Sequence, residues 1–329
     1  MEEGTVRQFA PDGPISLRIS VTDRCDLRCV YCTPSEGVEQ FAFAETLRYE
    51  EMLRFAQLVD KHFGLLKVHI TGGEPLGRPG ITTFVAMLAE AGITELAMTT
   101  NGQRLTEFAA ELKRAGLRRV NVSVDSLRAD VFSKITGTGE LSRTLAGIEA
   151  ALAAGLSPVK INTTVLRGVN DGEVLDIAQF GIDRGVPVRF IEIMPLGPAV
   201  ERHHEWFVPS AEVLDRLSER FDLQRLPRGR MRSTREYRAT DAGGGTGIVG
   251  MISSCSRPFC AGCTRLRLTA SGEVLGCLAR GTGRDIRRRL RMDGALDEEK
   301  IIDKIRLVLR EKRTSEGFTS DRYMLQVGG

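Results

Sequence analysis

Short runs of β-branched and other apolar residues alternate with longer amphipathic stretches from residue 16 to residue 194. The runs are nearly continuous in strand formers, whereas apolar residues in the stretches between them recur at three- and four-residue spacing. The expected strands cover residues 16–22, 67–71, 95–100, 119–124, 159–165 and 188–194. The expected helices cover residues 49–63, 83–92, 105–116, 141–155 and 172–185, and glycines at 92, 116, 155 and 185 stand where four of them would close.

This alternation predicts a parallel sheet with right-handed crossovers, either as a full or partial barrel or as a doubly wound open sheet. In all of these, ligands are bound at the carboxyl ends of the strands. Polar and glycine-rich segments follow five of the expected strands: the cysteine loop 25–32, "GGEP" (72–75), "NG" (101–102), "DS" (125–126) and Met194-Pro195. The pattern therefore predicts an active-site face at that rim.

The pattern changes after residue 198. A helix is expected over 210–221, and "DAGGGTG" (241–247) is interpreted as a flexible connector because it lacks the Gly-Lys-Ser/Thr ending of a phosphate-binding loop. "ASGE" (270–273) is the expected hairpin turn between two short strands. The basic run "RGTGRDIRRRLR" (280–291) is interpreted as a solvated helix face, with an anion-binding patch as the alternative.

The length of 329 residues suggests one large α/β domain and a smaller module, for which we expect boundaries of 1–197 and 198–329. The net charge is only +3, from 46 basic and 43 acidic residues, which is too even to indicate a nucleic-acid-binding protein. No apolar run is long enough to span a bilayer, and the first residues, "MEEGTVRQFAPDGP", do not resemble a secretory signal. We therefore expect a cytoplasmic protein without membrane partners.

Seven cysteines fall into two groups, with Cys25, Cys29 and Cys32 in the first and the cysteines at 255, 260, 263 and 277 in the second. Clustered cysteines in a cytosolic protein indicate metal ligands more readily than disulfides. Three thiolates can hold a four-iron cluster and leave one iron open to a small molecule. The alternative is a zinc site completed by His62, His69 or a cysteine of the second group, although the C-x3-C-x2-C spacing fits zinc poorly.

The segment "CDLRCVYC" (25–32) resembles the C-x3-C-x-aromatic-C signature of the radical S-adenosylmethionine (radical SAM) superfamily. In that superfamily the amino and carboxylate groups of SAM chelate the open iron. "GGEP" (72–75) is similar to the second motif of the superfamily, whose backbone contacts the SAM amino group. Both motifs stand where the superfamily has them, after the first two strands.

The second cysteine group resembles a narrower family. "FCAGCTRLRLTASGEVLGCL" (259–278) is similar to the C-terminal cluster segment of the GTP 3′,8-cyclases, which open molybdenum cofactor synthesis. The resemblance continues through "LRISVTDRC", "ITGGEPL", "TTNG", "NVSVDS" and "FIEIMPLG" and covers nearly the whole chain. Cys260, Cys263 and Cys277 form its second trio, whereas Cys255 fits neither spacing and is expected to act as a small apolar side chain.

The resemblance implies a partial (βα)6 TIM-type barrel with a C-terminal extension that carries a second iron–sulfur cluster. It implies two 4Fe–4S clusters and SAM as cofactors, and GTP as the substrate. In the family, SAM is cleaved to a 5′-deoxyadenosyl radical, which takes the 3′ hydrogen of GTP so that C3′ attacks C8 of guanine. An electron donor such as flavodoxin or ferredoxin and a homodimer are the implied partners, with no nucleic acid.

The resemblance also assigns site residues by position. It places Cys25, Cys29 and Cys32 on the catalytic cluster and Cys260, Cys263 and Cys277 on the second one. The implied SAM contacts are Tyr31, Gly73, Ser123 and Met194, and the implied GTP contacts are Arg18, Thr100, Lys160, Arg265 and Arg267. The terminal Gly328-Gly329 resembles a family tail that runs toward the active site, whereas a frayed chain end is the ordinary interpretation.

Charged side chains within the expected strands agree with an anionic substrate. Arg18, Lys160 and Arg189 lie in barrel strands, where an uncompensated charge is costly, and a triphosphate would supply the counter-charge. The alternative is that each pairs with a strand carboxylate such as Asp125 or Glu192. Two departures from the family pattern, His69 and Thr264, affect the GTP site, and Lys67 is the candidate to replace the arginine that many relatives have where this chain has His69.

Two other functions remain open from the sequence. One is a radical SAM enzyme that modifies a peptide, although such relatives usually carry two auxiliary clusters and this chain has cysteines for one. The other is a non-catalytic, zinc-stabilised barrel that binds a partner. Metal content separates this second alternative from both enzymes.

Overall fold

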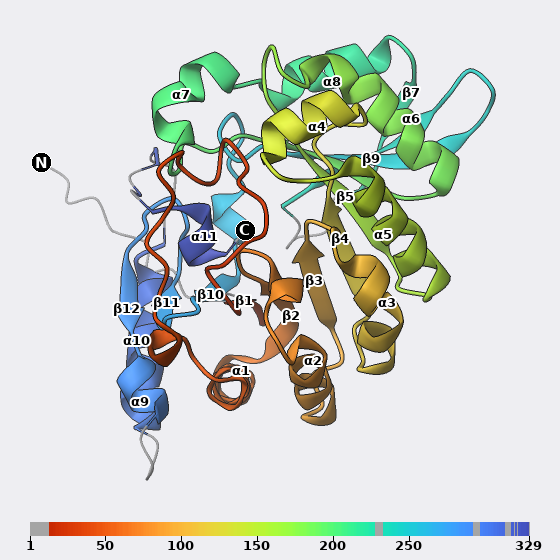
Figure 1. Cartoon of the computed structure of the whole chain (residues 1–329). Helices are drawn as coiled ribbons and strands as arrows, with labels where there is room; N and C mark the ends of the chain where they lie inside the picture. The colour runs from red at the N-terminus through yellow and green to blue at the C-terminus, as the bar shows by residue number, and fades with distance from the viewer. Residues whose placement is uncertain are drawn as a thin grey trace, which may run out of the picture.

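A computed structural model describes residues 13–227, 233–291, 297–312, 317–318, 320 and 322–328. Six parallel strands lie side by side in chain order, each paired with the next. They are β1 (Ile15–Ser20), β2 (Leu65–Thr71), β3 (Leu96–Thr100), β4 (Arg119–Ser123), β5 (Val159–Val165) and β6 (Val188–Glu192). They form the wall of a partial barrel (Figure 1).

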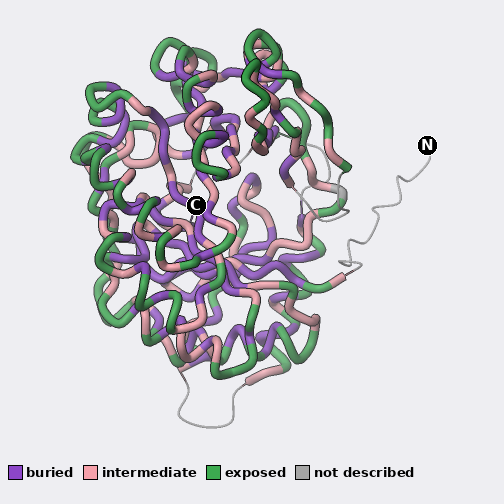
Figure 2. The backbone as a smooth tube through the Cα atoms, turned by 90° about the vertical axis from the view of Figure 1, so that its right-hand side faces the viewer, coloured by how far each residue is buried: buried purple, intermediate pink, exposed green. Residues whose placement is uncertain are grey.

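Amphipathic helices connect these strands and cover the outer face of the wall (Figure 1). They are α1 (Tyr49–Phe63), α2 (Ile81–Glu90), α3 (Leu105–Arg114), α4 (Ala129–Thr136), α5 (Leu141–Ala153) and α6 (Val174–Arg184). Buried strand residues such as Leu17, Ile70 and Phe190 pack with them in one large apolar core. Figure 2 shows this burial concentrated along the strands.

The predicted barrel elements are confirmed, because each predicted strand and helix begins and ends within two residues of an observed one. The four expected closing glycines all have positive φ, from 63° at Gly185 to 106° at Gly116. The pattern missed α4, which follows β4 directly.

Strands from the last third of the chain extend both edges of this wall. The whole sheet has the order β12-β11-β10-β1-β2-β3-β4-β5-β6-β9-β8-β7. The added strands are β7 (Asp222–Arg225), β8 (Arg235–Thr240), β9 (Thr246–Ile252), β10 (Arg265–Leu268), β11 (Glu273–Leu275) and β12 (Gly283–Asp285). Both β9 and β10 are parallel to their barrel neighbours, β6 and β1.

The remaining helices are α7 (Ala199–Trp206), α8 (Ser210–Ser218), α9 (Arg287–Arg291), α10 (Glu298–Arg310) and α11 (Met324–Val327). The helix expected over 210–221 is α8, and the turn expected at 270–273 joins antiparallel β10 and β11, so both predictions are confirmed. Short α11 ends next to the barrel wall, because Gly328 directly after it accepts a hydrogen bond from Arg267 on β10 and lies close to Ser20 on β1 (Figure 1). None of the described helices is long and apolar enough to cross a membrane.

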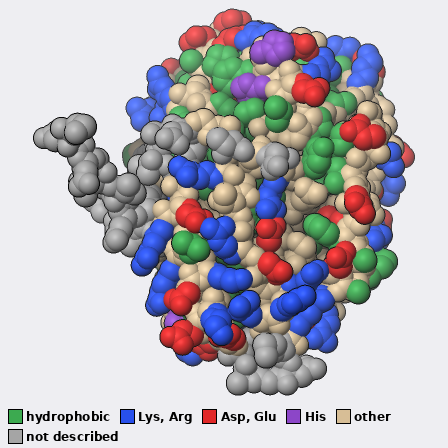
Figure 3. Space-filling view, turned by 90° about the vertical axis from the view of Figure 1, so that its left-hand side faces the viewer, with side chains coloured by type: hydrophobic (Ala, Val, Ile, Leu, Met, Phe, Trp, Pro, Cys, Tyr) green, Lys and Arg blue, Asp and Glu red, His purple; other side chains and the backbone are tan. Residues whose placement is uncertain are grey.

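Two sequence interpretations are wrong. The segment 241–247 is not a flexible connector: residues 241–245 form a tight hairpin turn, and residues 246 and 247 begin β9. The Asp241 carboxylate fixes the turn by accepting hydrogen bonds from the backbone N–H groups of Gly243 (2.9 Å) and Gly245 (2.8 Å). The basic run 280–291 is not one solvated helix face, since it contains β12 and α9, and Arg291 donates to the backbone oxygen of Thr46 at 2.8 Å. Figure 3 shows Lys and Arg side chains gathered on the side of the molecule that carries β12 and α9.

Candidate functional site

The first cysteine loop follows β1 and is held by the backbone of the "GGEP" segment. Gly73 N–H donates to the Thr22 carbonyl at 2.7 Å, and Glu74 N–H donates to the Arg24 carbonyl at 2.8 Å. A Cβ atom at Gly73 would collide with the Arg24 carbonyl oxygen. Only glycine fits this close approach, so the two motifs are physically joined.

The first trio, Cys25, Cys29 and Cys32, lies within this loop with the thiols close enough to affect one another. Burial raises the pKa of Cys29, and the neighbouring Cys32, Asp125 and Cys25 raise it further. Burial also raises the pKa of Cys32 to about 11. Three thiols held this close together are suited to bind the irons of one metal cluster.

Carboxylates surround the first trio. The Tyr31 hydroxyl donates to Asp125 Oδ2 at 2.6 Å, and burial raises the pKa of Asp125 to about 6. Burial raises the pKa of Glu74 to about 7, although Asn101 N–H and the Thr100 hydroxyl both donate to this carboxylate at 2.7 Å. The first trio therefore lies in a region of negative charge.

A single zinc ion is not supported at the first trio. Of the two histidines that could complete such a site, His62 contacts Glu298 and His69 lies 2.7 Å from the Thr99 hydroxyl. Among the described residues, no three His, Cys, Asp or Glu side chains are grouped to hold one metal ion. Thiolates on a four-iron cluster need not converge on one point, because each binds a different iron.

The second trio is assembled by a turn and a hairpin. Cys260 and Cys263 flank a short 3-10 turn in which Cys263 N–H donates to the Cys260 carbonyl at 3.1 Å. The chain then forms β10 and returns in β11, with Cys277 two residues beyond the end of that strand. The C-x2-C-x13-C spacing thus corresponds to one turn and one hairpin.

Cations surround the second trio. Lys312, only 5% exposed, donates from Nζ to the Cys263 carbonyl at 2.7 Å. Burial would raise the pKa of Cys263, but Lys312, Arg265 and Arg267 outweigh burial and hold this pKa below its ordinary value. This trio therefore lies in a region of positive charge.

The register of β10, β1 and β2 brings the basic side chains of these three strands level with one another. Arg267 on β10 is level with Arg18 on β1, which is level with His69 on β2. Two residues earlier along the strands, Arg265 on β10 and Lys67 on β2 are both level with Ser16 on β1. Alternation along each strand directs these side chains to one face, so they line a common lumen.

The lumen cations lower one another's pKa. Burial lowers the pKa of Arg18, and Arg267, Arg265 and Arg189 lower it further. Burial and Arg119 bring the pKa of Lys67 to about 8. Burial and the same cations lower the pKa of His69 well below its ordinary value, so His69 is neutral. The lumen is suited to a polyanion.

The expected alternative, in which strand carboxylates neutralise these cations, is wrong for Asp125 and Glu192. Asp125 accepts hydrogen bonds from Tyr31 and from Thr164 N–H at 2.7 Å. Glu192 accepts from Ser210 and from the loop before the second trio. For Lys160 the alternative is confirmed with a different partner, because its Nζ lies 3.8 Å from the carboxylate of Glu236 on strand β8.

The C-terminal tail connects the two trios. Leu325 in α11 lies close enough to Cys32 for its backbone to lower the pKa of that thiol, and three residues later the Gly328 carbonyl accepts a hydrogen bond from Arg267. A Cβ atom at Gly328 would lie 2.8 Å from Thr71 Cγ2. The tail is thus packed into the barrel as far as Gly328, which excludes fraying there, while Gly329 lies outside the described residues.

The structure places the predicted SAM contacts, Tyr31, Gly73, Ser123 and Met194, in the cysteine loop or at the ends of β2, β4 and β6. Four of the five predicted GTP contacts are strand cations, whereas Thr100 binds the Glu74 carboxylate. Sequence reasoning missed Lys312, which lies in no motif, and Arg119, which strand alternation could have revealed. It also missed that the Cys255 thiol donates to the Ile193 carbonyl at 3.4 Å.

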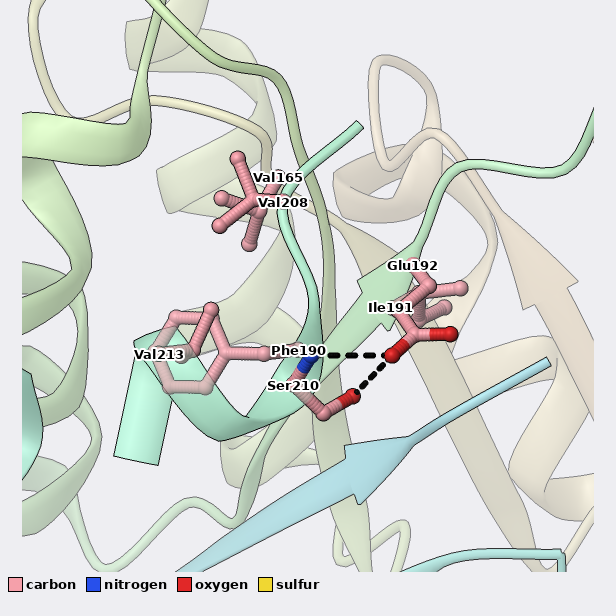
Figure 4. Close-up of a pocket in the computed structure, with 7 residues that line it drawn as sticks. All are labelled: Val165, Phe190, Ile191, Glu192, Val208, Ser210 and Val213. Carbon is pink, nitrogen blue, oxygen red and sulfur yellow. Dashed lines mark hydrogen bonds between the residues drawn. The ribbon is translucent and has the colours of Figure 1, made fainter. Parts of the chain in front are cut away.

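A shallow recess lies beneath α8 and has no room for a water molecule. It is lined by Val165, Phe190, Ile191, Glu192, Val208, Ser210 and Val213. Figure 4 shows Ser210 bonded to the Glu192 carboxylate at its edge. None of the predicted ligand contacts lines this recess.

Two family models match the chain. The model for the radical SAM superfamily matches residues 19–181, and the model for "Molybdenum Cofactor Synthesis C" matches residues 186–318. The GTP 3′,8-cyclase of Geobacter sulfurreducens is 48% identical over 276 residues, which cover 82% of each chain. The GTP 3′,8-cyclase of Pelotomaculum thermopropionicum is 44% identical over 323 residues, which cover 95% of this chain and 97% of the relative.

Solved structures show a similar fold. The Streptococcus suis SuiB structure with its precursor peptide SuiA has a TM-score of 0.62 and 16% identity, covering 92% of this chain and 68% of that one. SuiB bound to S-adenosylmethionine gives a TM-score of 0.56 over 87% of this chain and 65% of that one, at 17% identity. At this identity the likeness shows the fold alone, which confirms the partial barrel.

Proposed function

Because the chain belongs to the GTP 3′,8-cyclase family of radical SAM enzymes, we propose that it converts GTP to (8S)-3′,8-cyclo-7,8-dihydroguanosine 5′-triphosphate in molybdenum cofactor biosynthesis. One structural observation supports this reaction above the others. In the tail, Leu325 lies beside Cys32 and lowers the pKa of its thiol, and Gly328, three residues later, accepts a hydrogen bond from Arg267 next to the second trio. Two cysteine trios of opposite electrostatic character therefore serve one lumen.

The first trio would hold a 4Fe–4S cluster. Cys25, Cys29 and Cys32 fit this group because they provide three thiols in one loop and no described histidine joins them. Such a cluster, when bound, supplies the electron that cleaves SAM. The "GGEP" backbone fixes the loop, and Tyr31, Gly73, Ser123 and Met194 would position SAM at the strand ends.

The second trio would hold an auxiliary 4Fe–4S cluster that faces the substrate. Cys260, Cys263 and Cys277 fit it because the turn and the hairpin provide three thiols, and the cations beside Cys263 suit a nucleoside triphosphate. Arg18, Lys160, Arg265 and Arg267 would bind the phosphates, with Thr100 contributing from the end of β3. Neutral His69 leaves Lys67 as the charged residue of β2.

The chain's own residues would orient the ribose and exclude water. A primary alkyl radical reacts with whatever it meets first, so the ribose must be held close to SAM. Gly328 packs closely against Ser20 and Thr71 at the ends of β1 and β2. The tail would thus act as part of the wall between solvent and substrate.

Other features remain proposals. We expect a reductase such as flavodoxin or ferredoxin, a homodimer, and a cytoplasmic location in which the thiols stay reduced. The division into 1–197 and 198–329 also remains a prediction. The peptide-modifying alternative has support only from the fold of SuiB, and the zinc-stabilised binding protein is not supported by membership of an enzyme family.

An anaerobic assay with SAM, dithionite and each nucleoside triphosphate in turn tests the function. We expect 5′-deoxyadenosine and a cyclised nucleotide with GTP, and no cyclised product with ATP, CTP or UTP. Metal analysis should give about eight irons per chain. Zinc without iron, or a cyclised product from every nucleotide, would contradict the proposal.

A further inference from the structure

One buried carboxylate holds the loop that precedes the second trio. Glu192, at the end of β6, is 2% exposed. Its Oε2 accepts hydrogen bonds from the backbone N–H groups of Cys255 and Ser256, each at 2.9 Å. Its Oε1 accepts from the N–H and the hydroxyl of Ser210, each at 2.8 Å, as Figure 4 shows.

Neighbouring groups strengthen this attachment. The Ser254 hydroxyl donates to the Glu192 backbone carbonyl at 3.1 Å, and the Ser253 hydroxyl donates to the Ser210 hydroxyl at 2.8 Å. The Ser256 hydroxyl also bonds Glu192 Oε1. We name this network the Glu192 clasp; it comprises Glu192, Ser210, Ser253, Ser254, Cys255 and Ser256.

A carboxylate suits this position because of its capacity to accept hydrogen bonds. Two charged oxygens offer about four acceptor sites, whereas a glutamine amide has one oxygen and would place donors against donors. Burial would raise the pKa of Glu192, but the bonds from Ser256, Ser210 and Cys255 outweigh burial and keep the group ionised. The charge is therefore used to fix a loop and not to neutralise a lumen cation.

The clasp lies between two functional segments. Met194, a proposed SAM contact, follows Glu192 by two residues, and Cys260 of the second trio follows Ser256 by four. The clasp thus joins a chain segment at the SAM-binding rim to one that carries the auxiliary trio. A shift of the clasped loop would move the substrate relative to SAM, which matters because reaction geometry is sensitive to displacements of about 1 Å.

We propose that Glu192 is a positioning residue that sets the second trio relative to the SAM-binding end of β6 and thereby couples SAM cleavage to cyclisation. The positioning part follows from the hydrogen bonds of the clasp alone. The coupling part rests on the proposed function. Two separate measurements test the two parts.

Hydrogen exchange of the peptide covering residues 253–263 tests positioning without turnover. In Glu192→Gln the amides of Cys255 and Ser256 should exchange about tenfold faster than in the wild type. Glu173→Gln is the matched control, because Glu173 is also buried and accepts from the Ser126 hydroxyl at 2.7 Å and Leu127 N–H at 2.9 Å. It should leave exchange at 253–263 unchanged, and equal protection in wild type and Glu192→Gln would overturn the proposal.

The ratio of cyclised nucleotide to 5′-deoxyadenosine tests coupling. Glu192→Gln should form 5′-deoxyadenosine within about twofold of the wild-type rate, while the ratio falls about tenfold. A parallel loss of both products, or an unchanged ratio, would contradict coupling. If the wild type makes no cyclised nucleotide, the proposed function fails, and the exchange experiment still decides the role of the clasp.

A milder variant covers the case in which Glu192→Gln does not fold. Ser256→Ala removes one hydroxyl from an exposed residue and keeps its N–H bond to Glu192. We expect a threefold fall in the product ratio and faster exchange at 255–256. Ser218→Ala, which removes an exposed hydroxyl bonded to the Leu214 carbonyl, is the control and should change neither. No change in Ser256→Ala would count against the clasp.

Discussion

The two cysteine trios are alike in number but opposite in surroundings. Asp125, Glu74 and Asp26 lie near the first trio, and two of them raise the pKa of Cys25 in addition to the effect of burial. Lys312 and Arg265 lie near the second trio and lower the pKa of Cys263 against the effect of burial. The same set of three cysteines thus stands in two different electrostatic environments.

This difference corresponds to two ligands of opposite charge. The sulfonium of SAM is a cation, which carboxylates favour, whereas a nucleoside triphosphate is a polyanion, which buried guanidinium groups favour. Open corners on two otherwise similar clusters would therefore attract different molecules. The charges around each trio therefore distinguish a site suited to SAM from a site suited to a nucleoside triphosphate, whereas the cysteines alone are the same in both.

Loss of the first trio should have the largest effect. Cys29→Ala should reduce 5′-deoxyadenosine formation to background and lower iron to about four atoms per chain, because one cluster loses a ligand. Product chromatography and iron analysis measure this. Cys255→Ala, outside both trios, should retain the full iron content. Persistent 5′-deoxyadenosine in Cys29→Ala would remove the distinction between the trios.

Loss of the second trio should have a narrower effect. Cys263→Ala should still cleave SAM, since the first loop and the "GGEP" segment are untouched, but no cyclised nucleotide should form. The same chromatography measures both products in one experiment. Complete loss of SAM cleavage in this variant would show that the trios do not act separately.

Removal of one lumen cation should weaken the binding of the anionic ligand and leave the binding of SAM unchanged. Arg267→Ala deletes a guanidinium that is 6% exposed, and a charged hydrogen bond of about 1.5–3 kcal/mol corresponds to roughly 10- to 100-fold weaker GTP binding. Titration calorimetry with GTP and with SAM measures the two affinities separately. SAM affinity should stay constant, and Arg114→Ala, at an exposed end of α3, should change neither affinity.

The pH dependence of nucleotide binding should show the smallest effect. The pKa of Lys67 is about 8 in the free protein, and a bound polyanion would raise it. Affinity should therefore be steady below pH 7 and fall about fivefold as pH rises through 8 to 9, where the free protein loses this proton. His69 stays neutral throughout. Titrations of Lys67→Met should be flatter, and an identical pH profile in this variant would exclude Lys67.

Local patterns explain what could be predicted from the sequence. The strands from β1 to β6 and the positions of Arg18 and Lys160 follow from apolar runs and period-two alternation, which are properties of neighbouring residues. The pairing of β9 with β6 and of β10 with β1 depends on contacts between distant segments, and no local signal marks it. Lys312 is close to Cys263 for the same reason.

Glu192 illustrates a different limit. Its place at the end of a strand was correct, but a strand carboxylate near strand cations was expected to pair with them. Its partners are backbone N–H groups and hydroxyls of Ser210, Cys255 and Ser256. Backbone donors carry no sequence signature, so a carboxylate that binds them cannot be distinguished in advance from one that forms an ion pair.

The order of the twelve strands also has a consequence during synthesis on the ribosome. The wall from β1 to β6 is complete once residue 192 has emerged, yet its neighbours at the two edges, β9 and β10, begin only at residues 246 and 265. The nascent chain thus exposes two parallel edges, which are templates for intermolecular pairing, until these late strands arrive. A fragment that stops at residue 197 should aggregate, because it lacks β9 and β10, which pair with the exposed edges of β6 and β1 in the full chain.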